Sequence, residues 1–241
     1  FGYIDAMAEM AEEYPDVIFL HCSGYLNNDT NFANYFGKMY QPRYLSGLAA
    51  GAMTDSNKIG YVAAFPIPEV IRGINAFAAG VNEVNPEATV EVVWTFTWFG
   101  PEAETQAANA LLEKGADVLA QHQDSTATGL AAEAAGAKWI SYNTAYGQDS
   151  APEAFVTAPV WDWGPYYVNI VEQIIDGTFT TESYWGGMET GLVSLYDLSS
   201  DVPSDTATLI AEKTEAIIDG TLEVEIVEEE FISNVIGTVN P

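Results

Sequence analysis

His21 and His122 are the only two histidines of the chain, and they are the first side chains to consider for catalysis. His122 lies close to Asp124 and Ser125, so this short segment contains the three groups of a Ser-His-Asp triad. Triad members normally come from separate elements, however, and the sequence has no Gly-x-Ser-x-Gly turn. His21 lies in an apolar run, which is typical of a buried structural histidine. We therefore predict that the protein is not an enzyme and has no catalytic residues.

Motifs that hold metals or nucleotide cofactors are absent from the sequence. It contains no Gly-x-Gly-x-x-Gly, no Gly-rich loop ending in Lys and no His-Glu-x-x-His. Carboxylates are so numerous that no glycosidase-like pair can be singled out. We expect neither a metal ion nor a cofactor.

Aromatic side chains gather at the ends of predicted strands. Trp98 belongs to one such cluster, and Trp161 and Trp163 flank an acid just before Gly164 and Pro165. Flat aromatic walls favour a planar ring by stacking, while amides and carboxylates read its hydrogen-bonding edge. Aromatic residues with converging polar groups are typical of a small-molecule site.

Short apolar runs alternate with helical patterns along the chain, which predicts a mostly parallel sheet flanked by helices. The predicted strands are 17–21, 33–36, 59–64, 89–95, 118–121, 139–143 and 155–159. The predicted helices are 4–14, 43–52, 67–82, 102–114, 126–135, 166–176 and 206–218. In open α/β sheets ligands bind beyond the carboxyl ends of the strands, so the site residues are expected there.

The charge of the chain limits its partners. Its 241 residues include 35 Asp and Glu against 7 Lys and Arg, a net charge of −28. Binding to nucleic acid or to anionic lipid needs cations that this chain lacks. Unpaired carboxylates repel one another at ordinary ionic strength, and molar salt screens them. We favour a halophilic surface, and an acidic mesophilic protein is the alternative.

Several long motifs occur together: Tyr35-Phe36-Gly37-Lys38-Met39-Tyr40, Ala63-Ala64-Phe65-Pro66-Ile67-Pro68-Glu69, Gln121-His122-Gln123-Asp124-Ser125 and Trp161-Asp162-Trp163-Gly164-Pro165-Tyr166-Tyr167. With them the chain resembles the basic membrane protein (BMP) family of ABC-transporter substrate-binding lipoproteins, in the branch that binds purine bases or nucleosides. The resemblance runs from Phe1 to about Ile218, and the tail from Thr221 to Pro241 lies outside it.

The resemblance implies a type I periplasmic-binding-protein fold, in which two doubly wound α/β lobes are joined by a three-strand hinge. It places residues 1–56 and 150–180 in the N-terminal lobe, and residues 57–149 and 181–241 in the C-terminal lobe. The first βαβ segment of the N-terminal lobe is expected to be missing from this chain.

The resemblance also implies ligand-binding roles. On the N-terminal lobe these fall on Gly2, Tyr3 and Phe36, and on the C-terminal lobe on Phe65 and Glu69. Asp124 stands where relatives place a polar ligand contact.

Two positions depart from the family pattern. Trp161 stands where nucleoside-binding members have a Lys, and Asn143 where many have an Asp that holds ribose hydroxyls. Both departures favour a free purine base such as adenine over a nucleoside.

The implied partners are an ABC permease with its ATPase, and the implied location is outside the cytoplasmic membrane, held there by an N-terminal lipid. Three alternatives remain: a receptor of this fold for another small planar or polar solute, a sensor domain, and a nucleoside hydrolase. Release of base from adenosine would distinguish the hydrolase.

Overall fold

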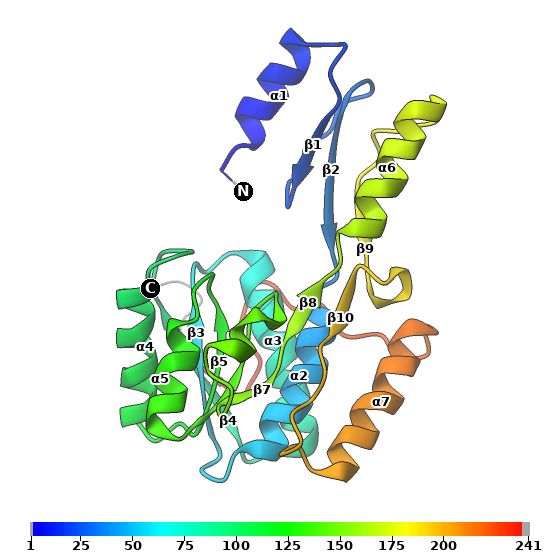
Figure 1. The fold of residues 1–241 in the computed structure, drawn as a ribbon. Helices are drawn as coiled ribbons and strands as arrows, with labels where there is room; N and C mark the ends of the chain where they lie inside the picture. Colours follow the sequence, from blue (N-terminus) through cyan, green and yellow to red (C-terminus); the bar gives the residue numbers. More distant parts are fainter. Residues whose placement is uncertain (1, 238–241) are drawn as a thin grey trace. The chain divides into compact units, whose positions relative to one another are not determined.

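The computed structural model describes residues 2–237, and it divides the chain into two compact units. Unit 1 comprises residues 1–38 and 162–193, and unit 2 comprises residues 39–161 and 194–241. The chain therefore passes between the units at three places, the number that the predicted three-strand hinge requires. Figure 1 shows the elements of both units.

Unit 2 is built on a six-stranded parallel sheet in the order β11-β4-β3-β5-β6-β7. Its strands are β3 (Lys58–Ala63), β4 (Thr89–Trp94), β5 (Val118–His122), β6 (Lys138–Ile140), β7 (Phe155–Thr157) and β11 (Val235–Ile236). Five helices belong to this unit: α2 (Tyr40–Met53), α3 (Pro68–Val84), α4 (Pro101–Glu113), α5 (Ala127–Ala135) and α7 (Ser204–Ile218). A short 3-10 helix, η1, spans Ala145–Asp149.

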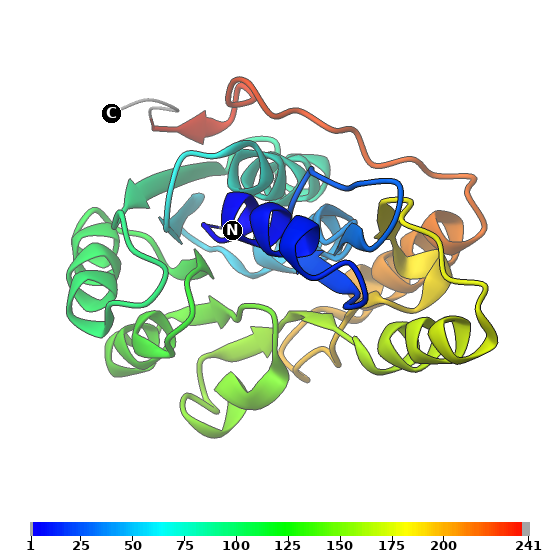
Figure 2. The ribbon, with the colours of Figure 1, turned by 90° about the horizontal axis from the view of Figure 1, so that it is seen from above.

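Helices cover both faces of this sheet (Figure 2). Side chains alternate between the faces of a strand, so Tyr61 and Val62 of β3 point to opposite layers. Val62 joins the core under α4 and α5, with Leu111 and Trp139, while Tyr61 makes an edge-to-face contact with Phe77 of α3. Strands buried on both faces are nearly continuous apolar runs, as the sequence of β3 shows.

Unit 1 contains a three-stranded parallel sheet, in the order β1-β2-β9, with two helices. Its elements are α1 (Ile4–Glu13), β1 (Phe19–Cys22), β2 (Phe32–Gly37), α6 (Gly164–Asp176), β9 (Tyr184–Gly186) and the 3-10 helix η2 (Met188–Thr190). Ile4 and Ala11 of α1 pack on Phe32 of β2 to form its small core. The strands β8 (Pro159–Trp161) and β10 (Val193–Leu195) form a separate two-stranded sheet.

All seven predicted helices and all seven predicted strands are present, with ends that shift by a few residues. Proline begins α3 and α4, because the N–H that it lacks would have no partner in the first turn of a helix. Gly136 and Gly177 end α5 and α6 in the left-handed conformation.

The two units group the elements in a definite way. The helix α2 belongs to unit 2 and packs along α3. Segment 150–161 also belongs to unit 2, and segment 181–193 belongs to unit 1. The lobe bounds that the resemblance implies stay a prediction.

The C-terminal tail, which the sequence motifs left unassigned, is bound to α3. Asn75 is 2% exposed, and its side-chain Nδ2 donates to the backbone carbonyls of Val227 and Glu230 at 2.9 and 2.8 Å. Its side-chain Oδ1 accepts from Ile232 N–H. Beyond these bonds, β11 pairs with β4. The tail therefore supplies the outermost strand of the unit 2 sheet.

The α2–α3 contact allows a prediction about stability. A Cβ on Gly80 would overlap the carbonyl of Tyr44, so the two helix backbones approach too closely for any side chain there. Gly80→Ala should therefore lower the free energy of unfolding by about 2–3 kcal/mol, despite the better helix propensity of Ala. Chemical denaturation measures this. Gly136→Ala, which meets no atom within 4 Å, should cost only about 1 kcal/mol from its left-handed backbone. Equal losses would contradict the close approach.

Candidate functional site

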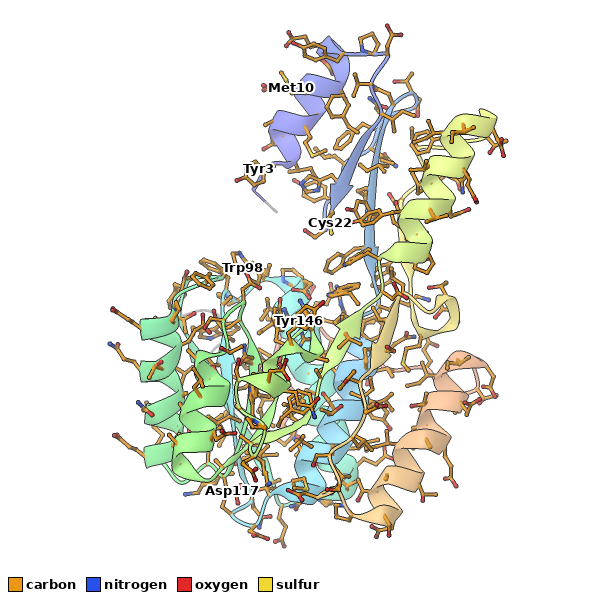
Figure 3. The ribbon with its side chains drawn as sticks, in the orientation of Figure 1. Tyr3, Met10, Cys22, Trp98, Asp117 and Tyr146 are labelled. Carbon is orange, nitrogen blue, oxygen red and sulfur yellow. The ribbon has the colours of Figure 1, made fainter. Side chains whose placement is uncertain are left out.

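The carboxyl ends of β3, β4, β5 and β6 meet at one edge of the unit 2 sheet. The segments that follow these strands carry Phe65, Trp98, Asp124 and Asn143, four of the residues expected to bind ligand. Figure 3 shows Trp98 at this end and Asp117, which precedes β5, at the other. Topology thus brings together residues that are as far as 78 positions apart in the sequence.

Three aromatic side chains form a wall at this edge. The ring centroid of Phe65 lies 5.6 Å from Trp98 and 6.4 Å from Phe96. The Trp98 carbonyl accepts from Asp124 N–H at 2.9 Å, which fixes the loop after β4 to the end of β5. Phe96 has a left-handed backbone (φ 55°) and is 48% exposed. A bulky residue in that conformation is strained, as residues at binding sites often are.

Two carboxylates accompany the wall. Glu69, in the first turn of α3, accepts from the His122 ring, with Nε2 and Oε2 3.0 Å apart. Asp124 is exposed, and partial burial of its carboxyl, together with the nearby Glu104, raises its pKa. Glu104 itself is buried and accepts from Ser125 Oγ at 2.5 Å. Both Glu69 and Asp124 can accept hydrogen bonds from a ligand.

Asn143 follows β6 in left-handed conformation, with φ 58°, which Asn tolerates better than most residues. It forms an isolated bridge with Val160 and is therefore next to Trp161 of β8. The Asn143 Oδ1 is buried, and no described residue donates to it. Because a buried polar atom without a partner is costly, this oxygen is suited to a ligand N–H or O–H.

The remaining expected residues belong to unit 1. Gly2 and Tyr3 precede α1, and Tyr3 is 74% exposed. Phe36 lies in β2 and is partly buried. Trp163 packs in a cluster with Tyr35, Tyr166, Tyr167 and Tyr184, and its centroid is 5.3 Å from Tyr35 and 6.1 Å from Tyr167.

The triad considered from the sequence is not assembled. The His122 ring is bonded to Glu69, and Ser125 Oγ donates to Glu104, so neither contacts the other in the way nucleophilic catalysis requires. The sequence did not indicate Glu69 as the partner of His122, nor the buried Arg43 and the partly buried Tyr142 beside it.

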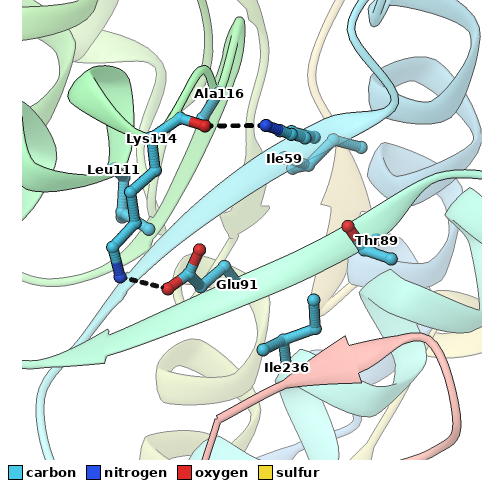
Figure 4. A pocket seen from close by; sticks show the side chains of 8 residues that line it. Ile59, Thr89, Glu91, Leu111, Lys114, Ala116 and Ile236 are labelled. Atoms are coloured by element: carbon cyan, nitrogen blue, oxygen red, sulfur yellow. Dashed lines mark hydrogen bonds and ion pairs between the residues drawn. The ribbon is translucent and has the colours of Figure 1, made fainter.

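Within residues 2–237 no cluster of His, Cys, Asp and Glu could hold a metal ion, and no helix has both the length and the apolar character to cross a membrane. A cavity of about 330 Å³ lies at the amino ends of β3 and β4 (Figure 4). It is lined by Ile59, Leu111 and Ile236, and Lys114 forms an ion pair with Glu91 beside it. This cavity is at the opposite end of the strands from the candidate site.

Two α/β units connected by three segments, with aromatic and polar groups at a carboxyl sheet edge, define the type I periplasmic-binding-protein class. A solved solute-binding protein of an ABC transporter system from Conexibacter woesei matches with a TM-score of 0.72 at 25% identity, over 90% of this chain and 74% of that one. The chain belongs to the family of PnrA-like ABC-transporter substrate-binding proteins, whose model matches residues 1–228. The resemblance inferred from the motifs is therefore confirmed.

Two curated relatives are similar over most of the chain. A putative ABC transporter glucose-binding protein of Haloferax volcanii is 45% identical over 93% of this chain and 57% of its own length. A purine-binding protein of Brucella abortus is 40% identical over 90% of this chain and 61% of its own length. The chain thus spans about three fifths of the length of these relatives.

Proposed function

We propose that this chain is the ligand-binding part of a receptor for an ABC importer and that it captures a purine, with a free base such as adenine favoured over a nucleoside. The observation that carries the proposal is the combination of the Phe65–Trp98 wall with two carboxylate acceptors, Glu69 and Asp124. A planar ring stacks on the wall, and its N–H groups are hydrogen-bonded by the carboxylates.

The receptor is proposed to lie outside the cytoplasmic membrane, held there by an N-terminal lipid, and to deliver its ligand to a permease with an ATPase. Units 1 and 2 correspond in this proposal to the two lobes of the receptor. Gly2, Tyr3, Phe36 and Trp163 are proposed ligand-binding residues of unit 1, and Asn143 and Trp161 are proposed ligand-binding residues of unit 2. The similarity to a purine-binding relative supports the ligand class.

A second candidate ligand is a sugar, because the relative with 45% identity is named a glucose-binding protein. Sugars also bind with carboxylates at their hydroxyls and with aromatic rings at their apolar faces. They lack a flat π-surface, however, so they gain less from a wall of three aromatic residues.

The aromatic wall provides the test of the proposed function. Trp98→Ala should weaken adenine binding by about fivefold to a hundredfold, since stacking contributes roughly 1–3 kcal/mol per base. Phe99→Ala is the matched control, because Phe99 lies on the same loop and is 65% exposed without a described ring contact. Fluorescence titration with adenine measures both variants. If Trp98→Ala binds adenine as well as the control does, the wall does not stack on the ligand.

A further inference from the structure

Arg43 is an unusual cation for a chain with five times as many acids as bases. It is 3% exposed, and none of the ion pairs among the described residues includes it. Its Nη1 donates to Tyr61 Oη at 3.1 Å, and its guanidinium lies 5.1 Å from the centroid of the Tyr142 ring. The Nε and Nη2 groups are buried and have no hydrogen-bond partner in the described chain. A buried guanidinium of this kind needs a nearby negative charge.

Glycine at position 73 makes room for this cation. A Cβ there would lie 2.9 Å from Arg43 Cδ and 3.4 Å from His122 Cε1. Gly73 is in α3, one turn after Glu69, so Arg43 and His122 lie against the beginning of the helix that carries the carboxylate. Glu69 is therefore the carboxylate whose negative charge can balance the positive charge of Arg43.

His122 holds one oxygen of Glu69. Its ring is fully buried, with Trp98 at 6.2 Å and Tyr142 at 4.9 Å between centroids, and it meets Glu69 Oε2 through Nε2. No described residue donates to or accepts from Nδ1. A protonated ring would leave a buried N–H donor there, so the neutral ring that donates from Nε2 is favoured.

No described residue donates to the second oxygen of Glu69, Oε1, and 24% of the side chain is exposed. One oxygen is thus fixed by a buried ring, and the other has no donor in the described chain. This is the arrangement of a preorganised acceptor.

We propose that Glu69 is an acceptor for a ligand N–H or O–H and that His122 and Arg43 are its positioning residues. His122 fixes the direction of the Glu69 carboxylate through its hydrogen bond. Arg43, which lies on α2, balances the negative charge of this carboxylate. The inference rests on the proposed function, since it assigns the roles within the same ligand site.

The titration behaviour of the groups agrees with this geometry. Burial alone would raise the pKa of Glu69, but the hydrogen bond from His122 and the charges of Arg43 and Arg72 lower it. Burial, followed by the charge of Arg43, lowers the pKa of His122. The titratable and charged groups that face this pair come from α2, β3, α3 and the segments after β5 and β6, and they are Arg43, Tyr61, Arg72, Asp124 and Tyr142. Arg72 is itself paired with Glu228.

The test is the pH dependence of adenine binding in a double-mutant cycle on the full-length protein. His122→Leu removes the donor, so burial raises the pKa of Glu69 and the affinity should fall at least about tenfold more than in the wild type between about pH 8 and 5. His122→Gln retains an N–H and should restore most of the wild-type profile. In a Glu69→Gln background, His122→Leu should add no pH dependence. Asp124 is present in every variant, so its own titration cancels.

Each outcome bears on one claim only. If the wild type binds adenine and His122→Leu has the wild-type pH profile, the positioning role is refuted while the proposed function stands. If the wild type binds glucose and no purine, the proposed ligand is wrong, and the same cycle with glucose still tests the acceptor. Should His122→Leu fail to fold, carboxyl-carbon NMR of the wild type decides, because a Glu69 that protonates above about pH 5 overturns the inference.

Discussion

Asp124→Ala is expected to weaken adenine binding by about tenfold to a hundredfold, because the loss of a charge-assisted hydrogen bond costs roughly 1.5–3 kcal/mol. Asp124 follows β5 at the sheet edge and is held beside the aromatic wall by its own N–H bond to Trp98. Asp124→Asn keeps one acceptor and should lose less. Calorimetry with adenine measures the three proteins.

The charge of Asp124 also predicts a pH dependence. Partial burial and Glu104 raise its pKa, so its carboxylate becomes protonated at a higher pH than an ordinary Asp. Only the ionised form accepts from two ligand donors, and affinity should therefore decline as the pH falls toward that pKa. Glu212→Ala, which removes an exposed acid of α7, is the control. Equal affinities for Asp124→Ala and this control would remove Asp124 from the site.

The second large effect is expected from salt. Seven cations cannot neutralise 35 carboxylates, and five of the seven are in ion pairs with Asp or Glu in the described structure. Raising the salt from about 0.1 to 1 M shortens the Debye length from about 10 to 3 Å and removes most of the repulsion. We therefore expect the melting temperature to rise by on the order of 10 °C.

Differential scanning fluorimetry in KCl, with sucrose of equal osmolality as the control, separates charge screening from solute exclusion. A melting temperature that rises equally in sucrose, or stays constant in KCl, would contradict the halophilic interpretation of the surface. The acidic mesophilic alternative predicts that constant value.

The elements were predictable because their signals are local. The helices α1, α3 and α6 show apolar spacing near 3.6 residues, and Pro68, Pro101 and Gly136 mark ends that depend on a single residue's backbone. By contrast, β11 contains two residues and exists because the tail is tied to Asn75, which is far away in the sequence. Nothing in the local pattern of residues 221–236 indicates that anchor.

The site was predictable only in part, for the same reason. The parallel topology predicted that residues after the carboxyl ends of the strands lie close together. Phe65, Trp98 and Asp124 are neighbours there. The partner of His122 is Glu69, which is 53 residues away, and no spacing rule connects a strand-end His to a helix-start Glu. Arg43 was missed because its place beside His122 and Tyr142 depends on the packing of α2 along α3, which no local pattern shows.

The most direct test of the central claim, that this receptor captures a purine, is isothermal titration calorimetry of the full-length protein with adenine, adenosine and glucose. The aromatic wall, the two carboxylates and the uncharged Asn143 predict that adenine binds at least as tightly as adenosine, and that both bind far more tightly than glucose. Adenosine binding about a hundredfold tighter than adenine would contradict the preference for the base. Binding of glucose with no heat from either purine would contradict the claim itself.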